Sequence, residues 1–193
     1  MININDYIKP TKEEIDWFDK NMFEIKSQNR PDLERGMLLY YLCKRYKAKK
    51  CLDIGTAGFF SAKSMAYSGA RVDTIDIKGE SVNYENINFI KGDSGDIVPV
   101  LGEYDVCFVD GDHSYMGVKE DLQNCKKRCK IIVAHDYGNL PEVTRAIDEE
   151  LPSFEFILED RMWKGAPYEN GVDKHGQKID YGVAVAFKGK DYE

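Results

Sequence analysis

The chain has 193 residues, of which 42% are hydrophobic and 32% are charged, and its formal net charge is −7. This length and balance predict one globular domain with a full hydrophobic core and exclude a disordered chain. The negative charge argues against nucleic acid as a partner, because binding to a phosphate backbone depends on a surplus of lysine and arginine.

Nothing in the sequence indicates a membrane or an oxidising compartment. No apolar run approaches the ~18 residues of a transmembrane helix, and the first residues lack the basic and apolar regions of a signal peptide. The five cysteines are an odd set, and Cys125 and Cys129 have no second pair with which to complete a zinc site. We therefore expect a cytoplasmic protein with no membrane partner.

The N-terminal part of the chain is expected to be helical. Residues 1–30 are interpreted as an extension with a polar helix over about 11–26, for which Thr11 is the N-cap. A second helix is predicted over about 32–47, where large side chains recur at three- and four-residue steps. The extension is expected either to cover the functional site or to pack against a second copy of the chain, and the sequence leaves the oligomeric state open.

Residues 31–193 form the predicted main domain, in which short apolar runs alternate with helical segments. Strands are predicted over 50–55, 70–77, 87–93, 104–112 and 130–137, and helices over 60–69, 114–127 and 140–151. This alternation is typical of an α/β fold with a doubly wound, Rossmann-like sheet that is mostly parallel and covered on both faces. The last two strands, over 154–159 and 181–189, have no helix between them and are expected to form an antiparallel pair at the edge.

Each predicted parallel strand ends in acidic side chains. In chain order these strand ends carry Asp53, Asp76, Asp93, Asp110 and the pair His135-Asp136. Ligands of open parallel sheets lie beyond the carboxyl ends of the strands, so these groups are expected to share one site. One such acid alone is explained by helix capping, for which Asp112 and Ser114 are candidates, but acids at five strand ends indicate ligand binding.

The glycine-bearing loop after the first predicted strand discriminates between cofactors. A dinucleotide fingerprint would place glycines at 55, 57 and 60, where the chain has Gly55, Ala57 and Phe60. A ligand without a pyrophosphate requires only a close backbone approach at Gly55 and Gly58 and an acceptor for its ribose hydroxyls. Asp76 lies 21 residues after Gly55, the usual offset for an acid that binds ribose.

Five segments resemble the successive motifs of the class I S-adenosylmethionine-dependent methyltransferases: CLDIGTAGFFSAKSMA, VDTIDI, INFIKGDS, YDVCFVDGDHSYMGVKEDL and IIVAHDY. They are most similar to the small-molecule O-methyltransferases with DGDHSY and HDY signatures, over roughly residues 33–150. The resemblance implies a seven-stranded sheet in which only the last strand is antiparallel. It also implies a small hydroxylated molecule, of sugar or natural-product type, as the methyl acceptor. One departure is clear, because the family usually has a glycine where Phe59 stands.

The resemblance further implies roles for the strand-end residues toward S-adenosylmethionine. Asp53 and Gly55 would lie near the methionine portion, Asp76 on the ribose, and Asp93 and Ser94 near the adenine. The same cofactor site is expected to include Thr56, Ala57, Gly58, Ile77 and Asp110.

In metal-assisted members of the family, the positions that match Asp110, His135 and Asp136 hold one divalent cation. These three residues are therefore the catalytic candidates, since an ion there would lower the pKa of a substrate hydroxyl and orient its oxygen. Two carboxylates and one imidazole suit Mg²⁺, Mn²⁺ or Fe²⁺, and Mg²⁺ is favoured in a cell. In the alternative interpretations, Asp110 binds the cofactor's ammonium without a metal, and His135 is a general base or a core histidine. His113 is expected to be structural.

Two further questions stay open on the sequence alone. The segment 160–180 is interpreted either as a substrate lid that carries Trp163, Tyr168 and His175 or as a surface loop. The competing functions are a non-catalytic binding protein on the same fold and a nicotinamide-dependent oxidoreductase, which Ala57 and Phe60 disfavour.

Overall fold

The structure, a computed structural model, describes residues 2–3, 7–13, 15–16, 20, 30–79, 83–138, 140–158 and 182–192. The candidate lid at 160–180 lies outside these residues. Part of the predicted helix over 11–26 also does, although residues 12–13, 15–16 and 20 are helical. Within the described residues, no helix combines the length and the apolar composition that a membrane crossing requires.

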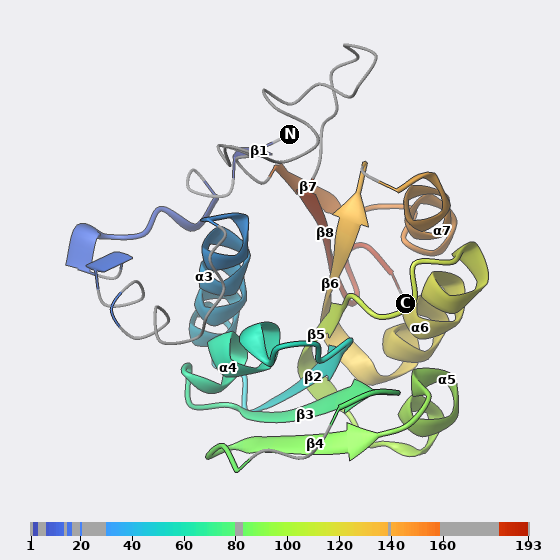
Figure 1. The fold of residues 1–193 in the computed structure, drawn as a ribbon. Coiled ribbons are helices and arrows are strands. Elements are labelled where there is room, and N and C mark those ends of the chain that lie inside the picture. Colours follow the sequence, from blue (N-terminus) through green and yellow to red (C-terminus); the bar gives the residue numbers. More distant parts are fainter. Residues whose placement is uncertain are drawn as a thin grey trace.

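The domain has three layers, with one twisted sheet between two groups of helices (Figure 1). On one face lie α3 (Arg30–Arg45) and α4 (Phe60–Ala66). On the other face lie α5 (Ser94–Ile97), α6 (Tyr115–Arg128) and α7 (Pro141–Glu150), and the short 3-10 helix η1 (Val98–Val100) follows α5. The helices predicted from the periodicity over 32–47, 60–69, 114–127 and 140–151 correspond to α3, α4, α6 and α7.

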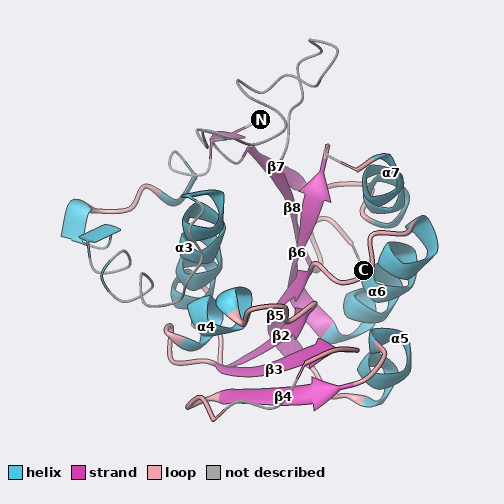
Figure 2. Cartoon of the chain, viewed as in Figure 1, coloured by secondary structure: helices cyan, strands magenta, loops and turns pink. Residues whose placement is uncertain are grey.

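The sheet has the order β1-β7-β8-β6-β5-β2-β3-β4 (Figure 2). Its strands are β1 (Ile2–Asn3), β2 (Lys50–Ile54), β3 (Arg71–Asp76), β4 (Ile87–Lys91), β5 (Tyr104–Val109), β6 (Cys129–Tyr137), β7 (Glu155–Leu158) and β8 (Gly182–Phe187). Only β8 is antiparallel to its neighbours, β6 and β7, so the predicted Rossmann-like fold with a reversed last strand is confirmed. The two-residue β1 pairs in parallel with β7, which the helical interpretation of residues 1–30 did not include.

Two hydrophobic cores form because side chains alternate between the faces of the buried strands. Val106 and Phe108 of β5 pack in the core under α3 and α4. Cys107 and Val109, which alternate with them, pack in the core under α6 and α7. Burial on both faces is the reason that the central strands read as continuous apolar runs rather than alternating ones.

Successive strands are added on one side of β2 as far as β4 and then on its other side from β5 onward, so the strand order reverses between β2 and β5. The ends of these two strands pack tightly against each other. The amide of Asp110 donates to the carbonyl of Ile54 at 2.9 Å. Gly55 has a φ of +92°, and a Cβ built on it would lie 2.0 Å from the carbonyl oxygen of Asp110. Only glycine fits this position, both for its left-handed backbone and for the contact.

The structure explains how the loop accommodates Phe59 at a position where the family usually has a glycine. Phe59 precedes α4 with φ 64° and ψ 15°, a left-handed conformation that glycine adopts without strain. Its ring is buried against the rings of Tyr84 and Phe89, with centroid distances of 5.9 and 5.7 Å. Burial of the ring offsets the backbone strain, so the loop keeps the shape that a glycine would give it.

We predict that Gly55→Ala lowers the free energy of unfolding by at least about 2 kcal/mol, because the new methyl group meets a backbone carbonyl that cannot move aside. Gly58→Ala is the matched control in the same loop. A Cβ on Gly58 meets nothing within 4 Å, so stability should change by less than about 0.5 kcal/mol. Urea denaturation of both variants tests this, and equal stability of the two would contradict it.

Candidate functional site

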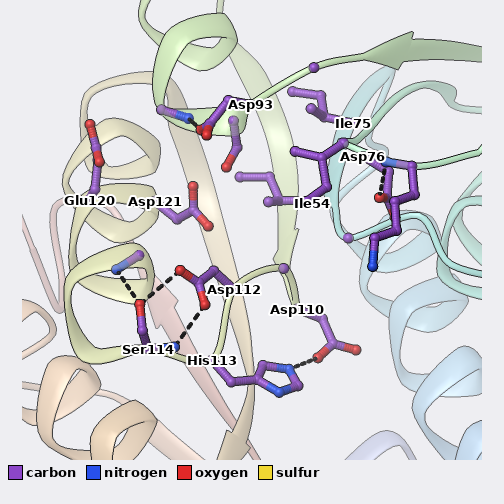
Figure 3. Close-up of a pocket in the computed structure, with 18 of the residues that line it drawn as sticks. Ile54, Ile75, Asp76, Asp93, Asp110, Asp112, His113, Ser114, Glu120 and Asp121 are labelled. Atoms are coloured by element: carbon purple, nitrogen blue, oxygen red, sulfur yellow. Dashed lines mark hydrogen bonds and ion pairs between the residues drawn. The ribbon is translucent and has the colours of Figure 1, made fainter.

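A cleft of about 950 Å³ opens at the carboxyl ends of β2, β3, β4 and β5. Its walls come from the loops that follow these strands and from the first turns of α6. Figure 3 shows Asp93 near one end of the cleft and Asp110 with His113 near the other. The cleft lies at the switch in winding direction, the position where open α/β sheets bind ligands.

The structure brings most of the predicted cofactor residues to the lining of this cleft, but three of them do not line it. The predicted residues that line it are Gly55, Ala57, Asp76, Ile77, Asp93, Ser94 and Asp110. Asp53, Thr56 and Gly58 are not among the lining residues. Asp53 and Thr56 are instead buried beneath the loop, with exposed fractions of 0% and 3%.

Asp53 is a buried carboxylate at the end of β2. Its Oδ2 accepts a hydrogen bond from the Thr74 hydroxyl at 2.6 Å, and that hydroxyl also lies 2.6 Å from the Thr56 hydroxyl. Among the described residues, the Oδ1 atom has no hydrogen-bond partner. Burial raises the pKa of Asp53 to about 7, against the opposing effect of the Thr74 hydrogen bond. The side chain therefore supports the loop from below and is half protonated near neutral pH.

Asp76 fixes the glycine-bearing loop from the neighbouring strand. Its Oδ2 accepts from the amide of Ala57 at 3.1 Å, and its Oδ1 accepts from the amide of Lys78 at 2.8 Å. Each carboxylate oxygen has a second lone pair available, so both can still accept from ribose hydroxyls. The residue thus ties the two loops that would face a bound nucleoside.

Some of the acidic and polar side chains that line the cleft also cap helices. Asp93 caps α5 by accepting from the amide of Gly95, and Ser114 caps α6 by accepting from the amide of Gly117. Asp112 supports the second cap, since its carboxylate accepts from the Ser114 amide at 2.9 Å and from its hydroxyl at 2.7 Å. The prediction that Asp112 or Ser114 caps a helix is confirmed for Ser114.

Several residues of α6 and its N-terminal loop line the cleft but were not predicted from the sequence to belong to the ligand site. They are His113, Met116, Gly117, Glu120 and Asp121. Asp121 is 2% exposed, and its burial raises the pKa to about 6. These residues follow one another at steps of three and four along one helix face, and this spacing is the sequence signal that could have predicted them as a group.

A second group of polar residues adjoins the cleft at Asp110. Ligand atoms of Asp110, His135 and Asp136 lie within 4.8 Å of one another, which is the arrangement that the metal prediction requires. The Nδ1 atom of His135 lies 3.1 Å from Asp110 Oδ1 and 3.4 Å from Asp136 Oδ2. His113, predicted to be structural, also enters this group, with its Nε2 3.4 Å from each of the same two oxygens.

Arg35 of α3 reaches this group through a contact across 100 residues, which the sequence pattern did not indicate. Its guanidinium hydrogen-bonds His135 Nε2 and lies 6.0 Å from the centroid of the Phe108 ring. A guanidinium only donates, so Nε2 accepts and the Nδ1 hydrogen points to Asp110. His135 is thus linked to two charged side chains, Arg35 and Asp110.

The side chains around Asp110 decide its protonation. Burial alone would raise the pKa of this carboxyl, but His135, His113 and Arg35 outweigh burial and hold the pKa well below its usual range. Conversely, the hydrogen bond to Asp110 raises the pKa of His113. Asp110 is therefore a carboxylate at every physiological pH, as a ligand for a cation must be.

Cys107, Cys125 and Cys129 form another cluster, within the core between β5, β6 and α6. Their sulfur atoms lie within 4.8 Å of one another, and the Cys107 and Cys125 sulfurs are 3.1 Å apart. The sequence spacing of Cys125 and Cys129 gave no indication that Cys107 lies beside them. The cluster lies among apolar side chains, where free thiols behave as small hydrophobic groups.

Comparison with known proteins identifies the class. A family described as "Methyltransferase domain" matches residues 35–137, more than half of the chain, and the protein belongs to this family. The matched region runs from Arg35 to Tyr137 and so contains every predicted site residue. No curated protein sequence matches the chain.

Solved structures share the fold at low sequence identity. An O-methyltransferase from Bacillus cereus in complex with SAH has a TM-score of 0.58 at 15% identity, covering 96% of this chain and 95% of that one. The O-methyltransferase TomG from Streptomyces achromogenes, in complex with SAM, has a TM-score of 0.58 at 17% identity, covering 93% and 92%. A spermidine synthase with a transition-state analogue also reaches 0.58, at 14% identity, covering 82% and 63%. At these identities the likeness concerns the fold.

We predict that the stability of Asp53→Asn relative to the wild type is greater at pH 8 than at pH 5. The folded pKa of Asp53, about 7, lies above its unfolded value, so the native state keeps a proton that the unfolded state releases. Raising the pH from 4 to 7 therefore costs the wild type stability, by up to about 4 kcal/mol, and the neutral amide avoids this loss. Denaturation of both proteins at several pH values measures the difference, and a pH-independent difference would refute the assignment.

Proposed function

We propose that this methyltransferase-domain protein uses S-adenosylmethionine to methylate an oxygen of a small hydroxylated molecule, with a divalent cation held by Asp110, His135 and Asp136. The observation that carries the proposal is the convergence of Asp76, Asp93 and Asp110, from three strand ends, on one cleft beside that group. The acceptor class, of sugar or natural-product type, rests on the resemblance of the DGDHSY and HDY segments.

The charge of the cleft favours a cationic cofactor. The described lining residues include six carboxylates and one lysine: Asp76, Asp93, Asp110, Asp112, Glu120, Asp121 and Lys78. S-adenosylmethionine carries a sulfonium and an ammonium, which such a surface attracts, whereas the pyrophosphate of a dinucleotide would be repelled. This argues against the nicotinamide-dependent interpretation independently of Ala57 and Phe60.

Apolar surface in the cleft suits the adenine ring. Ile77 and Met116 line the cleft and are 62% and 68% exposed, which is unusual for side chains of this size. They extend from the end of β3 and from the start of α6. A flat aromatic ring placed on them would bury this surface, with the ribose near Asp76 and the adenine near Asp93 and Ser94.

The residues around the reacting atoms have separate tasks. S-adenosylmethionine supplies a methyl group already activated on sulfur, and its positive charge disappears during transfer, so a carboxylate against the sulfur would favour the reactant over the transition state. The tight β2–β5 junction holds the cofactor loop rigidly beside Asp110, which favours in-line alignment of donor and acceptor. A divalent ion on Asp110, His135 and Asp136 would lower the pKa of the acceptor hydroxyl.

The donor set of that group is compatible with such an ion. Asp110 is held as a carboxylate, and Asp136 and His135 are each 7% exposed, so their ligand atoms are kept in place by the surrounding structure. His135 and Asp136 are not lining residues of the cofactor cleft. They therefore mark the side on which the acceptor is expected, with Asp110 between acceptor and cofactor.

The first test is calorimetry of cofactor binding. The wild type should bind S-adenosylmethionine and not NAD⁺, and Asp76→Ala should weaken binding by about 1–3 kcal/mol through loss of a charged acceptor. Asp73→Asn is the control on the same strand, since Asp73 accepts from Tyr104 and Asn88 outside the cleft and should leave the affinity unchanged. Binding of neither cofactor would favour the non-catalytic interpretation, and tighter NAD⁺ binding would refute the proposal.

The second test separates catalysis from cofactor binding. Transfer of labelled methyl groups to a panel of hydroxylated small molecules should fall by orders of magnitude in EDTA and return with a divalent cation. Asp136→Asn should abolish most of this transfer while S-adenosylmethionine affinity stays at the wild-type value. Glu149→Gln, on the surface of α7, is the control. Full transfer in chelator would remove the metal from the proposal.

A further inference from the structure

Asp121 of α6 is an acid at the floor of the cleft that caps no helix and has no place in the roles that the family resemblance implies. It is 2% exposed and yet lines the cleft, so the accessible part of its carboxyl group opens there. Figure 3 shows its side chain extending from α6 between those of Asp93 and Asp112. Burying a carboxyl group costs free energy, and an apolar residue would fill this position at lower cost.

Two glycines leave the carboxyl group of Asp121 open to the cleft. A Cβ built on Gly111 would lie 3.5 Å from Asp121 Oδ2 and 3.0 Å from Cγ2 of Ile54. Gly117 lies four residues before Asp121, on the same face of α6, and also lines the cleft. Helical side chains lean toward the N-terminus, so the carboxyl group extends over the turn at Gly117, where no side chain covers it.

A hydrogen bond to Ser94 places Asp121 at the adenine end of the cleft. The hydroxyl of Ser94, at the start of α5, pairs with the Asp121 carboxyl group. In the proposed function the adenine lies near Asp93 and Ser94, on the apolar surface of Ile77 and Met116. A hydroxyl donates only one hydrogen, so the carboxylate keeps lone pairs with which to accept from a ligand.

A carboxylate at this position distinguishes between purines. Adenine carries an amino group on C6, which donates hydrogen bonds, whereas hypoxanthine has the same ring shape and carries a carbonyl there, which only accepts. The carboxylate would bond the first group and repel the second. A site built to hydrogen-bond a polar group rejects an analogue without it far more strongly than an apolar pocket rejects a change of size.

We propose that Asp121 is a specificity-determining residue, which accepts a hydrogen bond from the 6-amino group of the cofactor's purine and so selects adenine over 6-oxopurines. The inference rests on the proposed function and adds to its cofactor site a residue from α6. It also gives the buried carboxyl group a role that only a bound nucleoside fulfils.

The surroundings of Asp121 make this selection depend on pH. Burial raises the pKa of its carboxyl group to about 6, against the effect of the Ser94 hydrogen bond, and the carboxylates of Asp93, Glu120 and Asp112 raise the pKa further. At pH 7.5 the group is therefore an ionised acceptor. At pH 5 it is mostly protonated and can donate to a 6-oxo group, so the selectivity should fall.

The test is calorimetry of the full chain with S-adenosylhomocysteine and with S-inosylhomocysteine, which differ at C6 of the purine, without metal. At pH 7.5 the wild type should bind the adenosyl compound at least about tenfold more tightly, and this ratio should fall at pH 5. Asp121→Asn should bring the ratio to within about threefold at both pH values, because the amide can turn its NH₂ group toward a 6-oxo oxygen.

The variant and its control separate recognition of the base from support of the fold. Asn has the shape of Asp and removes a buried charge beside three carboxylates, so Asp121→Asn should remain folded. Glu120→Gln removes the neighbouring carboxylate and should leave the ratio of the two affinities unchanged.

Each outcome has a definite meaning. If Asp121 only held Ser94 and α5 in place, its substitution would change both affinities alike. A ratio that Asp121→Asn leaves unchanged, or a wild-type ratio below tenfold at pH 7.5, would therefore overturn the inference while the proposed function stands. Failure of the wild type to bind S-adenosylhomocysteine would instead refute the proposed function, and the inference with it.

Discussion

The close contact between the ends of β2 and β5 is the constraint on which the site depends. The backbone of Gly55 approaches the carbonyl of Asp110 so closely that no side chain fits between them. In the proposed function, this contact joins the loop that would hold the methionine end of the cofactor to the carboxylate that would face the acceptor. The distance between the donor and acceptor sides would then be fixed by the core of the sheet, not by flexible side chains.

Charge is distributed around this junction in two distinct ways. In the cleft, carboxylates greatly outnumber lysine among the described lining residues, so a cationic ligand would neutralise the surface. Beside the cleft, Asp110 and Asp136 are interleaved with His113 and His135, and Arg35 hydrogen-bonds His135. Without an ion, the imidazole nitrogens and the guanidinium stabilise the two carboxylates, and a metal would take over that role. Asp110 belongs to both groups, and His135, His113 and Arg35 hold its carboxyl ionised by lowering its pKa.

Strain and buried charge occur close to the same junction. Phe59 has a left-handed backbone, and Asp53 is a buried carboxylate whose pKa is raised to about 7. Both lie at the glycine-bearing loop, and both reduce stability relative to simpler residues. Such features persist where the surrounding packing enforces them, and here the rings of Tyr84 and Phe89 and the hydroxyl of Thr74 provide that packing.

The sequence by itself determined the alternation of strands and helices, the reversed last strand and the acidic strand ends, because these follow from local apolar periodicity and from the rule that parallel strands end at one edge. Only the tertiary structure decided which acids face the cleft. Asp53 follows the same pattern as Asp76 yet is buried, because it pairs with Thr74, two residues before Asp76, and so lies deeper within the sheet. Arg35 and His113 join His135 through contacts across the fold, and no spacing along the chain encodes them.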